Sequence, residues 1–240
     1  MTVGETYALE LKDISKRFGS VQANDHVNLT LRKSEILAIL GENGSGKTTL
    51  MNMIYGIYYP DEGHIFVNGK EVTICSPKDS YELGIGMVHQ HFKLVDVLTA
   101  AENIVLGLPG KARLNMKKIT EDIQKLVNKY GFDLDLSKKI YEMSVSQKQT
   151  VEIIKMLYRG ARILILDEPT RGIDVGAKAE IYTIINNLAK QGLAIILISS
   201  EMPEVMNMSD RMMIMREGHI MGELSHDEYD QERILKYAMG

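Results

Sequence analysis

Three short apolar runs stand out in the pattern of hydrophobic and polar positions along the chain: Ile36–Leu40, Ile163–Leu166 and Leu193–Ile198. Each run has too few polar positions to form a solvated face, so each predicts a strand that is buried on both sides. Strands of this kind belong to parallel sheets that helices cover on both faces. The pattern therefore predicts an α/β fold with a mostly parallel sheet.

Helical segments connect these runs. The segment Lys47–Tyr55 follows the first run after six residues, and Gly176–Lys190 lies between the second and the third. In the latter segment the apolar residues fall on one stripe at helical spacing. These residues are Ile181, Ile184, Ile185 and Leu188. The order strand, helix, strand predicts the βαβ units from which parallel sheets are built.

The N-terminal part of the chain has a different pattern. Hydrophobic and polar positions alternate in Tyr7–Leu11 and Val27–Leu31, and His64–Val67 precedes an Asn68-Gly69 turn. Alternation with a tight turn predicts antiparallel strands. We therefore expect a small antiparallel sheet, separate from the parallel one.

The middle of the chain, from about residue 95 to 159, has helical spacing, including one apolar face within Ile119–Tyr130. Near the C-terminus, Met212–Met221 alternates around Glu217-Gly218 and predicts a hairpin to which we assign no chemistry. We find no repeat or linker. The expected organisation is one domain over residues 1–240, with a core of about 1–94 and 160–240 and a helical subdomain of about 95–159.

Composition narrows the class of protein. The longest apolar run is far shorter than the roughly 20 residues that a membrane-spanning helix needs, and no signal peptide is evident. The single cysteine, Cys75, cannot form an internal disulfide, which fits a reducing compartment. The net charge of −4 argues against nucleic-acid binding through bulk positive charge. We expect a cytoplasmic protein with no nucleic-acid partner.

The segment Gly41–Thr48 has the glycine, lysine and threonine spacing of a phosphate-binding loop, and it lies between a buried strand and a helix. Its glycines allow backbone N–H groups to surround phosphates, and the helix points its positive end at them. Lys47 would contact the β- and γ-phosphates of a nucleotide, and Thr48 would bind Mg²⁺. The alternative is a glycine-rich turn that only connects strand to helix. The candidate nucleotide-binding residues of this segment are Gly41, Glu42, Asn43, Gly44, Ser45, Gly46, Lys47, Thr48 and Thr49.

Two adjacent carboxylates end the second apolar run. Open α/β sheets bind ligands at the carboxyl ends of their strands, which is where Asp167 and Glu168 lie. Asp167 would hold Mg²⁺, and Glu168 would orient or deprotonate an attacking water. The alternative is a pair of acidic loop residues after a core strand. Together with the phosphate loop, the pair predicts a site for ATP and Mg²⁺.

A kinase or a GTPase would also fit these two features. Four further features occur in order: Phe18, Gln90 after Ile85–His89, Ser144–Gln147 at the start of a helix, and Gly172–Asp174 after the acidic pair. This set resembles ABC transporter ATPases over nearly the whole chain. The resemblance implies a P-loop NTPase core, an N-terminal antiparallel β subdomain and a helical subdomain that carries the signature sequence.

The resemblance also implies roles for these residues. Phe18 would stack on adenine, and Gln90 would link the nucleotide and its Mg²⁺ to the membrane partner. The signature residues Ser144, Ser146 and Gln147 would cover the γ-phosphate bound by another subunit, in an ATP-dependent homodimer or a pair with another ABC domain. Asp174 would cross the dimer interface. A helix N-terminus with a serine hydroxyl is itself suited to bind an anion.

The particular group that the chain resembles imports simple sugars and nucleosides and has tandem ATPases of twice this length. The run Val88–Val95 and the phosphate loop resemble the first domain of such a tandem, whereas Asp167–Gly176 and Ser199–Val205 resemble the second. Val145 replaces a usual glycine of the signature, as in that group, and Ser146 replaces the next one. The resemblance implies permease subunits as partners at the inner face of the membrane, with a solute-binding protein acting indirectly.

Ser200 occupies the position where family members carry a histidine that contacts the γ-phosphate and the catalytic glutamate. We therefore count Ser200 with Gln90 and Glu168 as candidate catalytic residues. The leading hypothesis is an ATPase that energises an importer. The alternative is a regulatory nucleotide-binding domain with weak or no hydrolysis. A soluble ABC ATPase acting on nucleic acid would carry long insertions, which the chain lacks.

His89 and His91 would share one face of a strand and could in principle bind a metal ion. No third ligand stands near them in the sequence. We interpret both as loop residues that border the interface with the membrane partner.

Overall fold

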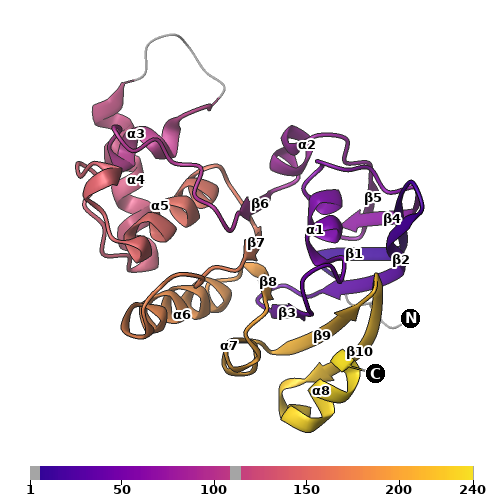
Figure 1. Ribbon diagram of the computed structural model, residues 1–240. Helices are drawn as coiled ribbons and strands as arrows, with labels where there is room; N and C mark the ends of the chain where they lie inside the picture. Colours follow the sequence, from indigo (N-terminus) through magenta and orange to yellow (C-terminus); the bar gives the residue numbers. More distant parts are fainter. Residues whose placement is uncertain (1–5, 109–114, 240) are drawn as a thin grey trace.

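The computed structural model describes residues 6–108 and 115–239. Its larger sheet has six strands in the order β10-β9-β3-β8-β7-β6 (Figure 1). The inner strands are parallel and only β10 is antiparallel to its neighbour. The bounds are β3 Ile36–Leu40, β6 Ile85–Val88, β7 Ile163–Asp167, β8 Ala194–Ser199, β9 Arg211–Arg216 and β10 His219–Ser225. The predicted α/β fold with a mostly parallel sheet is confirmed.

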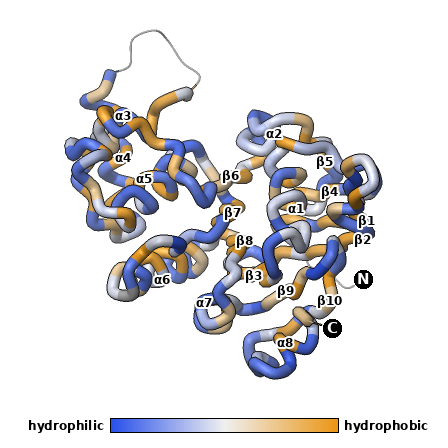
Figure 2. The backbone as a smooth tube through the Cα atoms, in the orientation of Figure 1, coloured by the Kyte–Doolittle hydropathy of each residue, from blue (hydrophilic) through white to orange (hydrophobic). Residues whose placement is uncertain are grey.

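Alternate residues of the central strands pack against two different sets of elements. In β7, Leu164 and Leu166 belong to the hydrophobic cluster of the helical region, whereas Ile163 and Ile165 face α1 and the antiparallel sheet. Figure 2 shows the resulting band of hydrophobic positions through the middle of the molecule. A strand that is buried on both faces has no polar alternation, which is why these runs could be identified in the sequence.

The N-terminal sheet is antiparallel, with the order β2-β1-β4-β5. Its strands are β1 Leu9–Phe18, β2 Val21–Leu31, β4 Glu62–Val67 and β5 Lys70–Val72. The sheet was expected, but β1 and β2 are much longer than the predicted segments. Bulges interrupt their register after Leu11 and Ile14, and these irregularities obscure the alternation that marks a strand in the sequence.

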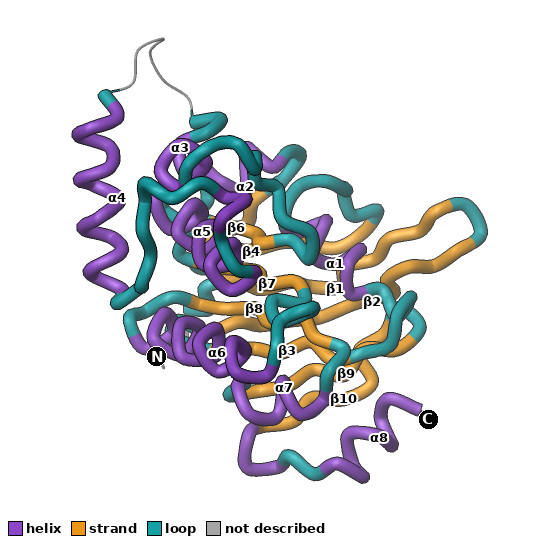
Figure 3. Tube along the Cα trace, turned by 60° about the vertical axis from the view of Figure 1, so that its left-hand side comes forward, coloured by secondary structure: helices purple, strands orange, loops and turns teal. Residues whose placement is uncertain are grey.

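Helices flank the larger sheet. α1 (Lys47–Ile54) and α2 (Pro77–Glu82) follow the phosphate loop and β5, and α6 (Val175–Lys190) lies between β7 and β8, as Figure 3 also shows. The helical region contains α3 (Ala100–Val105), α4 (Met116–Tyr130), the short helix Ile140–Glu142 and α5 (Val145–Tyr158). The structure thus contains the expected helical region, although residues 109–114 lie outside the described residues.

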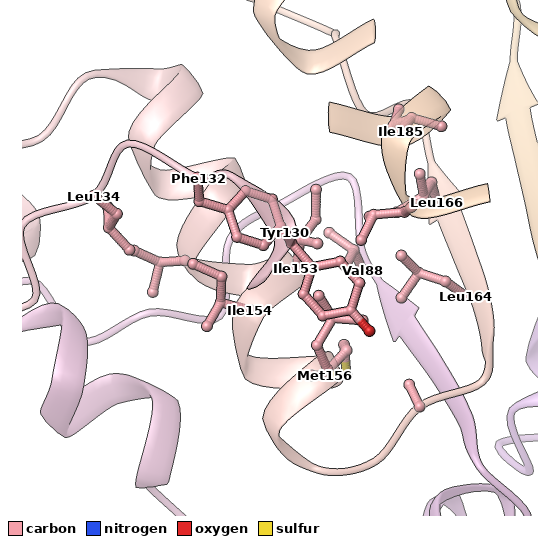
Figure 4. Close-up of a cluster of buried hydrophobic side chains, with 14 of the residues drawn as sticks. Val88, Tyr130, Phe132, Leu134, Ile153, Ile154, Met156, Leu164, Leu166 and Ile185 are labelled. Atoms are coloured by element: carbon pink, nitrogen blue, oxygen red, sulfur yellow. The ribbon is translucent and has the colours of Figure 1, made fainter. Parts of the chain in front are cut away.

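The helical region is joined to the sheet by a continuous core. Tyr130 and Phe132, at the end of α4, pack with Ile153 of α5, Leu166 of β7 and Ile185 of α6 in one buried cluster (Figure 4). The rings of Tyr130 and Phe132 lie 6.0 Å apart. Close packing of this kind fixes the direction of α5 relative to β7.

The C-terminal part contains the predicted hairpin as β9 and β10, but β9 also pairs in parallel with β3 and so belongs to the main sheet. The remaining elements are α7 (Met202–Met208), the short helix His226–Glu228 and α8 (Gln231–Met239). Across residues 6–108 and 115–239, no helix has the length and apolar character needed to cross a membrane.

Candidate functional site

The phosphate loop follows β3 and ends at the first residue of α1. Gly46 has a φ of 104°, and a Cβ atom placed there would lie 2.3 Å from the carbonyl oxygen of Ala23 in β2. A side chain at Gly41 would likewise lie 2.3 Å from the carbonyl oxygen of Met215. Both glycines are therefore required by close approach to neighbouring strands.

Lys47 is the first residue of α1 and is buried, with a side chain that folds back into the loop. Its Nζ donates hydrogen bonds to the carbonyl oxygens of Gly41, at 2.6 Å, and Glu42, at 2.8 Å. Burial lowers the pKa of Lys47, and the charges of Glu168, Asp167 and Glu42 oppose that shift. The ammonium group thus contacts two carbonyl oxygens of the loop and lies near two carboxylates, and an added phosphate could replace the carbonyl contacts.

Asp167 ends β7 and is 9% exposed. Burial, and then the neighbouring charge of Glu168, raise the pKa of Asp167, while Lys47 lowers it. A carboxylate that is desolvated and repelled by its neighbour gains stability from a bound cation. This electrostatic situation fits the predicted role of Asp167 in holding Mg²⁺.

Glu168 has a left-handed backbone conformation with a φ of 50°. Its N–H donates to the carbonyl oxygen of Ile198 at 2.9 Å, and the N–H of Ser200 donates to its Oε1 at 3.0 Å. The unusual backbone conformation is thus supported by bonds to β8 and to the residues after it. Strained conformations of this kind persist where surrounding contacts hold them.

A cavity of about 560 Å³ collects most of the predicted nucleotide site. Its lining includes the phosphate loop, the start of α1, both carboxylates, and Phe18 and Gln90, which the resemblance to ABC transporter ATPases led us to expect at the site. The predicted residues that line it are Phe18, Asn43, Gly44, Gly46, Lys47, Thr48, Thr49, Gln90, Asp167 and Glu168. Predicted residues from four separate segments of the chain therefore meet in one cavity.

Phe18 lies at the end of β1, at the edge of this cavity. Its ring is 43% exposed, and Tyr58 packs against it at 5.1 Å between centroids and 69° between planes. The Nζ of Lys16 also lies over the ring, 5.6 Å from its centroid, and such contacts hold an aromatic ring in place. Phe18 is thus placed where a planar base could stack on it.

Three predicted residues support the loop without lining the cavity. Gly41 and Glu42 supply the carbonyl oxygens that hold Lys47. Ser45 is buried; its N–H donates to the carbonyl oxygen of Glu42 at 3.2 Å, and its carbonyl accepts from Gly218 at 2.9 Å. These backbone bonds close the loop into a defined curve.

Sequence reasoning missed several cavity residues. Gln22 and Ala23 come from β2, Arg171 follows the carboxylates, and Glu217 lies in the turn between β9 and β10. The C-terminal hairpin, to which we assigned no chemistry from the sequence, therefore contributes to the lining of the cavity. Its turn lines the cavity and bonds to the phosphate loop through Gly218. No local pattern predicted this, because the contact depends on β9 pairing beside β3.

The signature residues lie outside this cavity. Ser144 caps the N-terminus of α5: its hydroxyl accepts from the N–H of Gln147, and the Gln147 side chain accepts from the N–H of Ser144. The hydroxyls of Ser144 and Ser146 are 3.0 Å apart. The serine-capped helix start is present as predicted, but it does not belong to the nucleotide cavity of the same chain.

Gln90 lines both the nucleotide cavity and a second cavity of about 460 Å³ that extends to Val145, next to Ser144. Strand β6 ends at Val88, so His89 and His91 lie in the loop after it rather than on one face of a strand. Burial, and then Lys93, lower the pKa of His89 to about 4. The ring of His89 packs edge-on against that of Tyr55, with 5.7 Å between centroids. Within the described ranges no group of three metal-binding side chains occurs.

The donor set of the main cavity fits Mg²⁺ and a nucleotide. Thr48 and Asp167 supply a hydroxyl and a carboxylate oxygen, which are the hard ligands that Mg²⁺ prefers. The loop N–H groups and Lys47 complement phosphate charge. The residues present therefore match the chemistry of a nucleotide that carries Mg²⁺.

Comparison with known proteins gives an independent result. Residues 24–171 match the family model described as ABC transporter. The chain is 42% identical, over 97% of its length, to the nucleoside import ATP-binding protein NupA of Lactococcus lactis, and 38% identical, over 97%, to a ribose import ATP-binding protein of Caldanaerobacter subterraneus. It covers 46% and 47% of those proteins, so it spans about half the length of the curated relatives it matches.

Solved structures agree with this match. A nucleotide-free ATP-binding cassette from an ABC transporter superposes with a TM-score of 0.85 and 26% identity, over 98% of this chain and 99% of that one. The ADP conformation of MJ1267, an ATP-binding cassette of an ABC transporter, gives a TM-score of 0.85 and 27% identity, over 96% of this chain and 98% of that one. With the phosphate loop, the carboxylate pair and the signature helix in these positions, the chain belongs to the ABC transporter family and has the fold of its ATP-binding cassettes.

Proposed function

We propose that the chain binds Mg-ATP in the main cavity and hydrolyses it to drive import of a simple sugar or nucleoside. The observation that carries the proposal is the meeting of Phe18, Lys47, Thr48, Asp167 and Glu168 around one cavity at the carboxyl edge of the parallel sheet. Open α/β sheets bind their ligands at this edge. The names of the curated relatives support the transport part of the proposal.

Each residue has a chemical task in this proposal. Phe18 stacks on adenine, the loop N–H groups and Lys47 bind the phosphates, and Thr48 and Asp167 hold Mg²⁺. The metal ion supplies charge neutralisation on the phosphates. Glu168 accepts a proton from the attacking water, and the N–H of Ser200 orients its carboxylate at 3.0 Å.

The site needs a second cassette. Ser144, Ser146 and Gln147 lie outside the cavity, so they cover the γ-phosphate bound by another ABC domain rather than by their own chain. The second domain is another copy or a related cassette. ATP binding then closes the pair, and hydrolysis releases it.

The closed and open pairs move integral-membrane permease subunits at the inner face of the membrane, and a solute-binding protein delivers the solute to the permease. Gln90 is suited to link the two parts, because it borders both the nucleotide cavity and the cavity near α5. The regulatory alternative is less favoured, because the relatives named above are import ATP-binding proteins.

Nucleotide binding and turnover test the proposal. Purified chain should bind ATP more tightly with Mg²⁺ than with EDTA, and it should release phosphate at concentrations that allow pairing. Glu168→Gln should keep ATP affinity and lose turnover, because the amide keeps the shape of the side chain and cannot accept the proton. Failure to bind ATP would reject the nucleotide site, and equal turnover in the variant would reject Glu168 as the base.

Transport requires a separate measurement. The chain, expressed together with candidate permease subunits, should co-purify with them, and Glu168→Gln should abolish uptake of ribose or nucleosides by the reconstituted complex. Uptake that is unchanged in the variant would show that hydrolysis by this chain does not drive import.

A further inference from the structure

Glu204 is a buried carboxylate that the proposed chemistry does not use. It lies in α7 and is 3% exposed. Its two oxygens accept hydrogen bonds from two hydroxyls, those of Thr170 at 2.7 Å and Ser199. Among the described residues it has no ion pair, although burial of a carboxylate is costly without compensation. Burial raises the pKa of Glu204, and the hydrogen bonds from Ser199 and Thr170 oppose that shift. A polar group that is buried and held by two hydroxyls suggests a role beyond packing.

The two hydroxyls come from two different segments, the loop after β7 and the last residue of β8. Thr170 follows the carboxylates at the end of β7 and is 1% exposed, and Ser199 ends β8 and is fully buried. Strands β7 and β8 are neighbours, with Asp167 paired to Ile198. Glu204 therefore ties together the two chain segments that leave the carboxyl edge of the sheet at the nucleotide cavity.

These segments carry the groups that hold Glu168. The N–H of Ser200 donates to Glu168 Oε1 at 3.0 Å. On the other side of that peptide, the N–H of Glu201 donates to the hydroxyl of Ser199 at 3.0 Å. The hydroxyl of Ser199 thus closes a turn around Ser200 while it donates to Glu204. The direction of the Ser200 N–H depends on this turn.

The segment after β7, which carries Thr170, supports the backbone of Glu168. The φ of Glu168 is 50°, in a region that few residues other than glycine adopt without support. Thr170 is two residues later and is anchored to Glu204 through its hydroxyl. Glu204 therefore supports both the backbone of Glu168, through Thr170, and the Ser200 N–H that donates to the Glu168 carboxylate, through Ser199.

We infer that Glu204 is a positioning residue that holds Glu168 in its reactive orientation by binding the hydroxyls of Thr170 and Ser199. This inference rests on the proposed role of Glu168 as the base. Its contribution is geometric: Glu204 does not line the cavity, and it acts through Thr170 and Ser199.

Thr170 offers a matched pair of variants. Thr170→Ser keeps the hydroxyl and loses a methyl group, whereas Thr170→Val keeps the branched shape and loses the hydroxyl. We expect kcat for ATP hydrolysis to follow the hydroxyl: Thr170→Val and Glu204→Gln lower it by at least tenfold, and Thr170→Ser keeps it within about threefold. A displacement of about 1 Å at a reacting group can cost about 10²-fold. ATP affinity should be unchanged in all three, and melting temperatures measured alongside identify any loss that reflects unfolding.

A double-mutant cycle separates positioning from a general structural effect. In a Glu168→Gln background, Thr170→Val should have no further effect on residual single-turnover hydrolysis, because the group that it positions is already absent. An equal fold-loss in both backgrounds would overturn the inference. So would a Thr170→Val enzyme with wild-type kcat.

Amide hydrogen exchange tests the same link without activity. Thr170→Val and Glu204→Gln should speed exchange at the Ser200 and Glu201 amides, and Thr170→Ser should not. If the wild-type chain binds ATP without hydrolysing it, the proposed function fails, and the exchange data alone decide the inference. Unchanged exchange at both amides in Thr170→Val would reject it.

Discussion

Lys47 is the residue with the clearest electrostatic requirement in the cavity. Lys47 is 6% exposed, and its ammonium donates to two loop carbonyls. Burial lowers its pKa, and the charges of Glu168 and Asp167 oppose that shift. A phosphate offers charged oxygens in place of carbonyls, and bonds between charged groups are about twice as strong. Binding of a nucleotide is thus favoured by the exchange of contacts at Lys47.

Replacing Lys47 with alanine should weaken Mg-ATP binding more than tenfold, because the variant loses the charge that faces the phosphates. Titration calorimetry measures the change. Lys190→Ala, at the exposed end of α6, is the matched control and should bind as the wild type does. Equal affinity in Lys47→Ala would show that the nucleotide binds elsewhere.

Ser200 lies next to Glu168, at the position where family members carry a histidine. Its N–H binds Glu168, but its side chain is exposed and its hydroxyl has no hydrogen bond within the described part of the chain. A histidine at this backbone position would reach further than a hydroxyl and could support charge on the γ-phosphate. One such donor contributes about 10²–10³ in rate.

We therefore expect slow hydrolysis by the wild-type chain and faster turnover in Ser200→His, with little change in ATP affinity. The comparison requires protein concentrations at which both variants bind ATP and pair equally. Ser200→Ala is the control and should match the wild type, because the wild-type hydroxyl has no partner. If the wild-type turnover already lies within the usual range of about 1–10³ s⁻¹ and Ser200→His does not raise it, then Ser200 does not slow hydrolysis.

At the scale of elements, the phosphate loop depends on contact with β2. Gly46 and Gly44 both have positive φ values, 104° and 87°, but only Gly46 lies against another strand; at Gly44 a Cβ atom would meet nothing within 4 Å. Backbone strain in a non-glycine residue costs about 1–3 kcal/mol. Gly46→Ala adds a steric clash to this strain.

Both Gly44→Ala and Gly46→Ala should lower the free energy of unfolding, because both positions have a positive φ. Gly46→Ala should lower it by roughly 1–3 kcal/mol more, which is the typical cost of overpacking. Urea denaturation measures both. Equal losses in the two variants would show that the loop moves away from β2 at little cost.

The strands and loops of the structure can be compared with those that the sequence predicted. Strands β3, β7 and β8 were predicted almost to the residue, because burial on both faces leaves continuous apolar runs. The phosphate loop and the carboxylate pair were predicted because their chemistry requires residues close in sequence. The lengths of β1 and β2 were wrong, because bulges break the alternation. Glu217 and Arg171 were missed, because only the tertiary arrangement brings them to the cavity.

At the scale of the whole molecule, the signature helix and the nucleotide cavity do not meet. Ser144 and Ser146 are joined to each other and to the start of α5, and none of the residues Ser144–Gln147 lines the cavity around Lys47. Glu168→Gln, which preserves binding and prevents hydrolysis, should therefore accumulate as an ATP-dependent dimer. Size-exclusion chromatography with light scattering detects it, and Glu168→Gln/Lys47→Ala should remain monomeric. A Glu168→Gln chain that stays monomeric with saturating ATP would contradict pairing between copies.

Complementation between two inactive chains tests whether a site is shared. Lys47→Ala lacks the phosphate contact but keeps its signature, and Ser144→Arg blocks the signature but keeps its own cavity. Each variant alone should be inactive, because every site in either homodimer contains a damaged half. In an equimolar mixture, mixed dimers combine the intact cavity of the Ser144→Arg chain with the intact signature of the Lys47→Ala chain. We expect ATPase activity to reappear in the mixture and to increase with the fraction of mixed dimers. A mixture that stays inactive, while chromatography shows mixed dimers, would mean that each chain completes its own site.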